Sequence, residues 1–250
     1  MKFVDCHAHL TDNRFNLKNY RFDGFAVVNS GYDRESSFCA KKISEIYPSF
    51  YFTCGIQPEE IREGWQDFIK ELPNLAQDKK CVAIGECGLD YHYTKDNKDL
   101  QKQVFIEQMK LADQLKKPVV IHSRDCCQDT FDVIKEHINL LSDGFLLHCY
   151  SYSKELAVEF AKLGAYFSFG GVITFKNAKK EEILKAIPLD RVLSETDSPY
   201  MSPEPLRGTL NTPLNVPIIV KKMALIYDKS EEEMKSILYE NACRFYRIKF

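Results

Sequence analysis

The chain has 250 residues, of which 44% are hydrophobic and 28% are charged, and its 34 basic and 36 acidic side chains leave a formal charge of −2. This composition is that of an ordinary globular protein, and the near-neutral charge excludes a polybasic coat for nucleic acid or membranes, although not a local basic cleft. No hydrophobic run approaches the roughly 18 residues that a membrane span requires. The sequence begins without the pattern of a signal peptide, and its nine cysteines are irregularly spaced with no CxxC pair. We therefore expect a cytoplasmic protein with no disulfide framework and no membrane partner.

Eight short runs of apolar or β-branched residues recur along the chain. They span residues 3–6, 25–29, 51–55, 82–85, 119–122, 145–148, 165–169 and 192–195. Continuous apolar runs of this kind are typical of strands that are buried on both faces of a parallel sheet.

The stretches between these runs are long enough for helices. Over 99–117, leucines and a valine recur at helical spacing until Pro118 ends the pattern, and Ser230 to Glu233 form a capping-box pattern before the last helix. Eight strands alternating with helices in 250 residues is the count of a (β/α)8 TIM barrel. An open doubly wound sheet is the alternative, but no GxGxxG or Walker loop follows any expected strand. We predict an α/β protein with a single barrel domain over residues 1–250.

Four of the six histidines lie at the C-terminal ends of expected strands. His7 and His9 follow the first strand two residues apart, so strand alternation points both to the same side, where both can reach one ion. His122 and His148 end the fifth and sixth strands. For the His7 and His9 pair alone, exposed or hydrogen-bonded histidines would be an equally good interpretation.

Carboxylates stand at two further strand ends. Glu86 follows the fourth apolar run and Asp197 follows the eighth. An ionisable group at such a position is costly to desolvate unless it is paired or bound to metal, and in a barrel all these ends converge on one mouth. Nitrogen and carboxylate ligands in this number suit one or two divalent ions. The predicted ligands are His7, His9, Glu86, His122, His148 and Asp197.

Five motifs in chain order resemble the TatD family of metal-dependent deoxyribonucleases. They are Asp5-Cys6-His7-Ala8-His9-Leu10, Gly85-Glu86-Cys87-Gly88-Leu89-Asp90-Tyr91, Val120-Ile121-His122-Ser123-Arg124-Asp125, Leu147-His148-Cys149 and Ser194-Glu195-Thr196-Asp197-Ser198-Pro199-Tyr200. The resemblance runs from residue 3 to about residue 246. It implies a TIM barrel of the amidohydrolase kind with two metal ions, one held by His7, His9 and Asp197, the other by His122 and His148, with Glu86 bridging them.

One segment departs from the family. After the third strand the family usually has Gly-Ile-His-Pro-His, whereas this chain has Gly55-Ile56-Gln57-Pro58-Glu59. We expect these residues to line the mouth, so metal binding should survive while phosphate handling or substrate choice changes. Gln57 can donate a hydrogen bond but cannot carry a proton or a positive charge.

Other polar residues near the expected mouth are weaker candidates for substrate contacts. Arg124 could clamp a phosphate, unless it forms a salt bridge with Asp125 or another loop carboxylate. Arg207 and Asn211 follow the eighth strand, where barrels often bind phosphate, although a turn would explain their loop equally well. Tyr91 and Tyr93 could stack on a base, although packing is the expected role of both, and His92 could border the site, although a surface position is expected. Packing or structural roles are expected for His137, Cys6 and Cys149.

The leading hypothesis is a metal-dependent hydrolase of phosphodiester bonds in DNA, exonucleolytic, with Asp197 and Glu86 as catalytic residues. Asp197 would act as general base for attack by a metal-activated water. The lysine pairs are dispersed over the chain, so DNA would be held at the mouth, as single strands or at ends. The two ions could be Zn²⁺, Mn²⁺, Mg²⁺ or Co²⁺, and the chain is compatible with a monomer. A hydrolase of a small ester, lactone or amide is the alternative, and a non-catalytic metal-binding scaffold is a second one.

Overall fold

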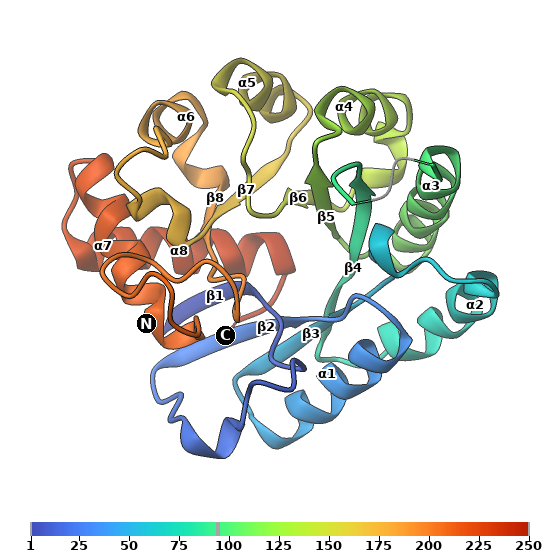
Figure 1. Ribbon diagram of the computed structural model, residues 1–250, viewed down its shortest axis with the longest axis horizontal. Helices are drawn as coiled ribbons and strands as arrows, with labels where there is room; N and C mark the ends of the chain where they lie inside the picture. Colours follow the sequence, from blue (N-terminus) through green and yellow to red (C-terminus); the bar gives the residue numbers. More distant parts are fainter. Residues whose placement is uncertain (1, 94–95, 250) are drawn as a thin grey trace.

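Eight parallel strands form the centre of the computed structural model, and they lie side by side in chain order (Figure 1). The structure describes residues 2–93 and 96–249, so the two ends of the expected 1–250 barrel and residues 94–95 lie outside it. The strands are β1 (Phe3–Ala8), β2 (Phe25–Ser30), β3 (Phe50–Cys54), β4 (Cys81–Asp90), β5 (Val119–Arg124), β6 (Phe145–Leu147), β7 (Tyr166–Phe169) and β8 (Val192–Ser194). Each of the eight expected strands is present, and the TIM barrel is confirmed.

Helices surround the strands as an outer layer (Figure 1). In the described residues these are α1 (Arg34–Ile46), α2 (Trp65–Ala76), α3 (Lys98–Leu115), α4 (Cys127–Glu136), α5 (Lys154–Lys162), α6 (Glu181–Ala186), α7 (Val216–Ile226) and α8 (Glu231–Tyr246). The alternation is less strict than expected, because only a short 3-10 turn, Leu17–Asn19, lies between β1 and β2, while α7 and α8 both follow β8. The predicted capping box is present, since Ser230 and Glu233 exchange hydrogen bonds at the start of α8.

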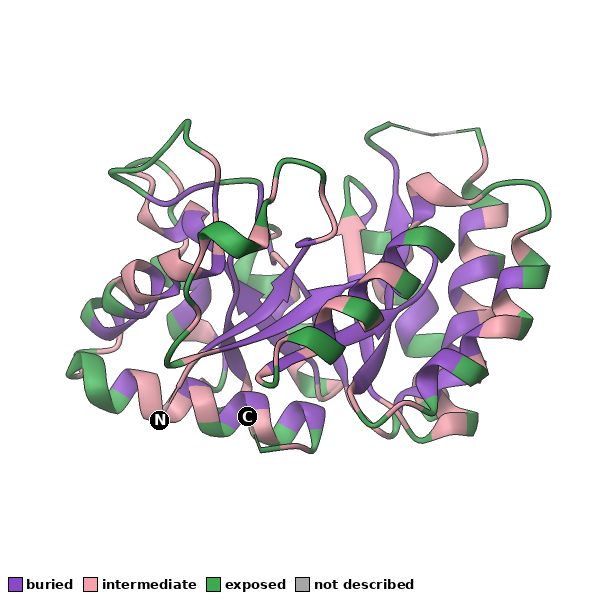
Figure 2. Ribbon diagram, turned by 90° about the horizontal axis from the view of Figure 1, so that it is seen from below, coloured by how far each residue is buried: buried purple, intermediate pink, exposed green. Residues whose placement is uncertain are grey.

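One end of the barrel is closed by α8. Buried apolar side chains of the strands form one cluster with Phe245 and Tyr246 of α8. The Tyr246 hydroxyl donates to the Cys6 carbonyl at 2.7 Å. Figure 2 shows the strands almost wholly in the colour of buried residues. Polar inward side chains therefore collect at the opposite end, where the strands end.

The ring of strands is nearly closed, because β8 lies beside β1. The Ser194 hydroxyl donates to the Val4 carbonyl at 2.8 Å, and the Asp197 backbone N–H donates to the His7 carbonyl at 3.0 Å. These bonds join residues 190 positions apart in sequence. They also bring the segment after β8 against two of the predicted metal ligands.

In the part of the chain that the structure covers, no helix combines the length and apolar character needed to cross a membrane. All nine cysteines lie in that part, and each is a free thiol.

Candidate metal centre

His7 and His9 reach the centre from the end of β1. The pairing with β2 shifts register between Asp5 and Ala8, so a bulge turns this part of the strand. The Nε2 atoms of His7 and His9 then lie 3.1 Å apart, on the same side as predicted. The Nδ1 atom of His9 lies 3.2 Å from the Ser30 carbonyl at the end of β2, which fixes the orientation of the ring.

Glu86 lies inside β4, which runs five residues farther than its apolar run predicts. The register between β4 and β5 shifts between Ile84 and Cys87, and this bulge contains Glu86. A Cβ atom on Gly85 would lie 2.5 Å from the Val120 carbonyl oxygen, and the Gly85 φ of 138° also favours glycine. Glycine therefore allows the close approach to β5 that turns the Glu86 carboxylate into the barrel, where only 1% of the residue is exposed.

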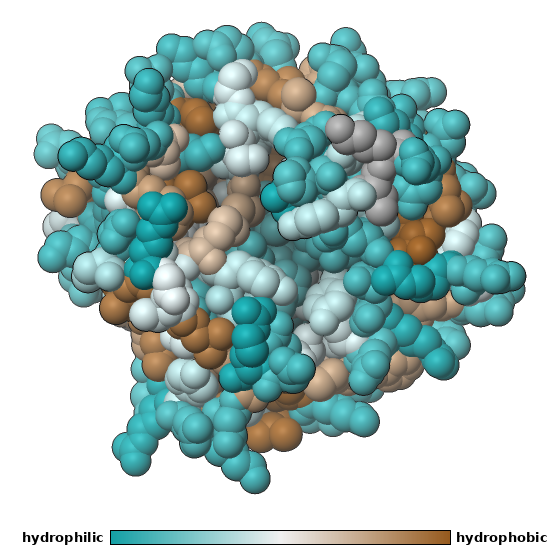
Figure 3. Space-filling model, in the orientation of Figure 1, coloured by the Kyte–Doolittle hydropathy of each residue, from teal (hydrophilic) through white to brown (hydrophobic). Residues whose placement is uncertain are grey.

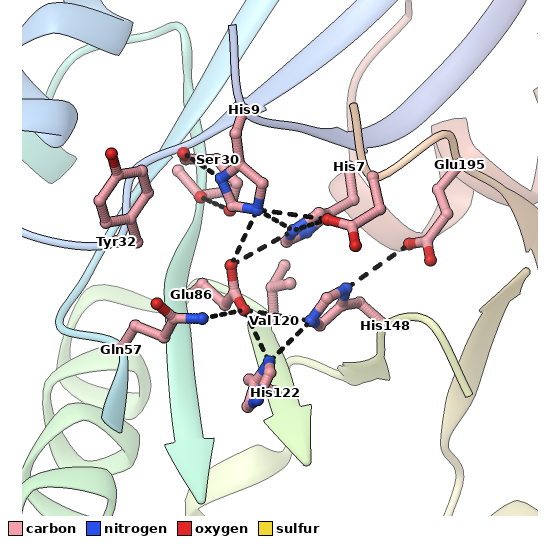
Figure 4. Close-up of polar contacts among 12 residues, drawn as sticks. His7, His9, Ser30, Tyr32, Gln57, Glu86, Val120, His122, His148 and Glu195 are labelled. Carbon is pink, nitrogen blue, oxygen red and sulfur yellow. Dashed lines mark hydrogen bonds and ion pairs between the residues drawn. The ribbon is translucent and has the colours of Figure 1, made fainter. Parts of the chain in front are cut away.

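The two carboxylate oxygens of Glu86 face different histidine pairs (Figure 4). Oε2 lies 3.3 Å from His7 Nε2 and 3.4 Å from His9 Nε2. Oε1 lies 3.0 Å from His122 Nδ1 and 3.1 Å from His148 Nε2. One carboxylate thus connects four imidazoles that come from three strand ends.

Asp197 approaches the centre from the segment after β8. Its Oδ1 lies 3.3 Å from His9 Nε2 and 3.7 Å from His7 Nε2. Its backbone φ of 52° is left-handed, and its N–H is bound to the His7 carbonyl. The Asp197 carboxylate therefore lies beside the imidazoles of His7 and His9.

Two further carboxylates stand behind the other histidine pair. Asp90 Oδ2 lies 2.9 Å from His122 Nε2, which leaves Nδ1 as the nitrogen that faces Glu86. Glu195 Oε2 lies 3.8 Å from His148 Nδ1 and accepts a hydrogen bond from Ser168, and burial raises the pKa of Glu195 to about 8. Sequence reasoning gave neither acid a role, although both stand in the ligand motifs.

These donor atoms fit divalent cations. Two ligands of a tetrahedral zinc ion, each about 2.0–2.1 Å from the metal, lie about 3.3 Å from each other. The facing nitrogens of His7 and His9 are 3.1 Å apart, and those of His122 and His148 are 3.2 Å apart. Glu86 Oε2 is buried and accepts no hydrogen bond, which leaves a lone pair for a cation. Three overlapping groups of potential ligand atoms each lie within 4.8 Å of one another.

The charges of the buried groups support the same conclusion. Burial opposes the ionisation of Glu86, but His148 and His7 outweigh it and hold the pKa of this carboxyl well below its ordinary value. Burial also opposes the charge of His9, yet the Asp197 and Glu86 carboxylates raise its pKa to about 9. Burial, with His148 nearby, lowers the pKa of His7 to about 4. The carboxylates thus attract positive charge into the centre, and metal binding would replace protons there.

A cavity of about 770 Å³ opens above these residues, and Figure 3 shows the hollow on this face of the molecule. Gln57 and Glu59 line it, as expected of the mouth. Gln57 also reaches farther in, because its Nε2 donates to Glu86 Oε1 at 3.2 Å. Arg124 lines the same cavity, with its Cζ 5.0 Å from the centroid of the Tyr93 ring.

Two predicted substrate contacts are not among the residues that line the cavity. Asn211 is fully buried, and its amide donates to the Thr196 and Tyr200 carbonyls, so it orders the loop after β8. Arg207 is exposed, and its Cζ lies 4.4 Å from the centroid of the Phe175 ring. The positions of both residues therefore agree with a turn in this loop and not with a substrate contact.

Two side chains that were expected to pack lie in the cavity wall instead. Cys149 follows His148 but does not continue a strand, because β6 ends at Leu147 and Cys149 has a left-handed φ of 47°. Strand alternation therefore gave the wrong direction for this side chain. Tyr93 lies beyond the end of β4 and is 63% exposed.

The remaining expectations agree with the structure. Tyr91 is buried and donates to Asp129, and Cys6 is buried in the apolar cluster beneath the centre. His92 is on the surface and pairs with Asp125. His137 follows α4, where its Nδ1 lies 3.1 Å from a backbone carbonyl of that helix.

Comparison with known proteins identifies the family. Residues 4–247 match the family described as TatD related DNase. The chain is 38% identical over 254 residues to the uncharacterized metal-dependent hydrolase YabD of Bacillus subtilis, covering 98% of both chains, and 32% identical over 262 residues to the uncharacterized metal-dependent hydrolase YcfH of Escherichia coli, covering 99% and 97%. The crystal structure of YJJV, a TatD homolog from Escherichia coli, matches with a TM-score of 0.88 at 25% identity and covers 98% of both chains. The resemblance found in the motifs is confirmed: this chain belongs to the TatD family of metal-dependent hydrolases.

Proposed function

We propose that the protein hydrolyses phosphodiester bonds of DNA, at single strands or ends, with two divalent ions bound in the barrel mouth. The observation that carries this proposal is the position of Glu86, whose two oxygens each face a separate pair of imidazole nitrogens. A carboxylate shared in this way is suited to bridge two ions. The match to a family described as TatD related DNase supports DNA as the substrate.

The distances support a division of the proposed ligands between two ions. His7, His9 and Asp197 converge on the side of Glu86 Oε2. His122 and His148 converge on the side of Oε1. Zn²⁺, Mn²⁺, Mg²⁺ or Co²⁺ would be compatible with these nitrogen and oxygen ligands, and the metal that is bound would depend partly on availability.

When bound, two ions held by these residues would supply an activated water and would polarise the phosphate oxygen under attack. Asp197 borders the cavity and carries the carboxylate that would accept a proton from the attacking water. Arg124 would bind a phosphate oxygen, because guanidinium matches phosphate oxygens two at a time. In the described parts of the chain no carboxylate pairs with the Arg124 guanidinium, and Asp125, the alternative partner, pairs with His92 Nδ1 at 2.8 Å.

The closed lower end and the cavity volume support single-stranded or frayed DNA as the substrate. The cavity holds about 770 Å³, which suits a nucleotide and its neighbours better than the interior of a duplex. Efficient cutting inside a covalently closed duplex would contradict this part of the proposal.

The test is hydrolysis of end-labelled single-stranded DNA by protein that has first been treated with a chelator. We expect activity to return with Mg²⁺, Mn²⁺ or Zn²⁺ and to be absent in Glu86→Ala. Asp197→Asn should fold and show no turnover, and a fully active Asp197→Asn enzyme would remove the general-base role. If a protein carrying two ions hydrolyses no DNA, the substrate assignment is wrong.

A small ester, lactone or amide is the second candidate substrate, and Glu59 is the observation that favours it. Glu59 lines the cavity where the family usually has a histidine. An acid at this position repels a polyanion more than a histidine does. A panel of small phosphoesters and lactones, compared with DNA under the same metal, separates the two candidates.

A further inference from the structure

Two arginine–tyrosine stacks lie at the mouth of the cavity. The Arg124 Cζ is 5.0 Å from the centroid of Tyr93, and the Arg14 Cζ is 5.0 Å from the centroid of Tyr200. Both tyrosines line the cavity, and they are 63% and 50% exposed. Both rings are therefore partly open to the cavity and available to a ligand.

The stacks adjoin different parts of the metal centre. The Tyr200 ring lies 6.5 Å from the His9 ring, edge to face. Arg124 is paired in register with Asp90, the residue that contacts His122. A chain bound across the centre would therefore meet one stack beside His9 and the other beside His122.

The stacks also differ in charge. Arg14 is neutralised by Asp12, with Nε 2.8 Å from Oδ1 and Nη2 2.9 Å from Oδ2. This bidentate pair fixes the guanidinium over one face of Tyr200 and leaves the ring half exposed. Arg124, by contrast, has no carboxylate partner in the described residues. A neutral aromatic face suits a nucleobase, whereas an unpaired guanidinium suits a phosphate.

We propose that Tyr200 is a platform on which one base of a single strand stacks, while Arg124 holds a backbone phosphate on the other side of the metal centre. The inference rests on the proposed function and deepens it by naming what each side of the cavity recognises. The strand is then held at two points, with the scissile phosphate between them. A base inside a duplex is already stacked on both faces, so the platform selects unpaired nucleotides.

The experiment measures binding separately from catalysis. A fluorescein-labelled oligothymidylate decamer is titrated with the Asp197→Asn chain in excess manganese, after the metal content of this variant has been measured, and binding is followed by fluorescence anisotropy. Adding Tyr200→Ala should weaken binding about 10–100-fold, because stacking on one aromatic ring contributes on that scale, whereas Tyr200→Phe should retain it within about twofold. The parent chain should bind a decamer of abasic residues more weakly than oligothymidylate by the same factor. Tyr200→Ala should not weaken the binding of the abasic decamer further.

Two arginine variants complete the test. Arg124→Ala should weaken binding. It should also reduce the steepness of the plot of log affinity against log salt concentration by about 0.7, the value for one phosphate contact of a single strand. Arg191→Ala is the matched control, because it removes an arginine–tyrosine stack, with Tyr166 at 4.7 Å, whose residues do not line the cavity. The control should bind like the parent chain.

Failure of this inference is distinct from failure of the proposed function. Binding that depends on Tyr200, without hydrolysis by the native chain, supports the platform and rejects the nuclease. Hydrolysis by the native chain, with binding that Tyr200→Ala leaves unchanged, supports the nuclease and overturns the platform. No measurable binding of the decamer also overturns the platform.

Discussion

The two histidine pairs that face Glu86 are held by different kinds of partner. His9 turns its outer nitrogen to the neutral Ser30 carbonyl at 3.2 Å, whereas His122 turns its outer nitrogen to the Asp90 carboxylate at 2.9 Å. Asp197 lies on the side of His9 that faces Glu86. Asp90 and Glu195, by contrast, lie at the outer nitrogens of His122 and His148.

The difference separates the proposed tasks of the two ions. Counting Glu86 in both, the His9 side offers four ligands and the His122 side offers three. A metal site with three protein ligands retains an open position for water or substrate, whereas four ligands close a tetrahedral site. Arg124 also stands on the His122 side, so we expect the phosphate oxygen to bind there.

The largest effect should follow from removing the residue that both sides share. Glu86→Ala deletes one partner of several buried charge contacts, which corresponds to about 3–5 kcal/mol, or roughly 10²–10⁴-fold in metal affinity. Elemental analysis after dialysis should find less than one ion per chain. Glu59→Gln is the matched control, because it changes a cavity carboxylate that, in the described residues, forms no hydrogen bond or ion pair with a proposed ligand, and its metal content should be unchanged. Two ions retained by Glu86→Ala would remove the bridging role.

Variants of single proposed ligands should each affect one ion and not the other. His9→Ala and His122→Ala should each lose one ion and retain the other, with a loss of affinity at the altered site larger than the roughly 10–100-fold typical of an outer partner. Isothermal titration with manganese measures the number of sites and the affinity of each. If either variant loses both ions together, the two sides are not independent.

A smaller effect should follow from changing the partner behind His122. Asp90→Asn keeps the size of the side chain but removes its charge, and we expect metal affinity at the His122 side to fall about 10–100-fold, with the His9 side unchanged. Competition with a chromophoric chelator measures this. Asp125→Asn breaks another aspartate–histidine pair, on the exposed His92, and should leave both affinities unchanged. An equal loss in the two variants would contradict the role of Asp90.

The smallest effect should come from Gln57. Gln57→Leu removes the hydrogen bond to Glu86 Oε1 and should lower kcat/KM on single-stranded DNA by about tenfold, the scale of a hydrogen bond to a charged group. Gln57→His restores a donor at this position and should keep most of the activity. If Gln57→Leu is as active as the parent chain, the contact with Glu86 does not support turnover.

Sequence reasoning predicted the barrel and brought the six proposed ligands to one place, because polar residues at the ends of apolar strands can converge only at the mouth. It did not predict the bulges in β1 and β4, which depend on the pairing of neighbouring strands. It also gave no role to Asp90, since only the fold shows which nitrogen of His122 faces outward. Cys149 was placed on the wrong side because the end of β6, and with it the limit of strand alternation, is not visible in the sequence.

The junction between β8 and β1 has a consequence for how the protein is made. The His9 side of the centre needs Asp197, whose backbone is bound to His7 near the other end of the chain. The His122 side needs only residues up to His148 and Glu86. During synthesis, the ligands of the second side leave the ribosome long before the first side can be completed. If two ions are bound as proposed, full metal loading would be a late event that follows the approach of β8 to β1, and a truncated chain ending before β8 would hold at most one of them.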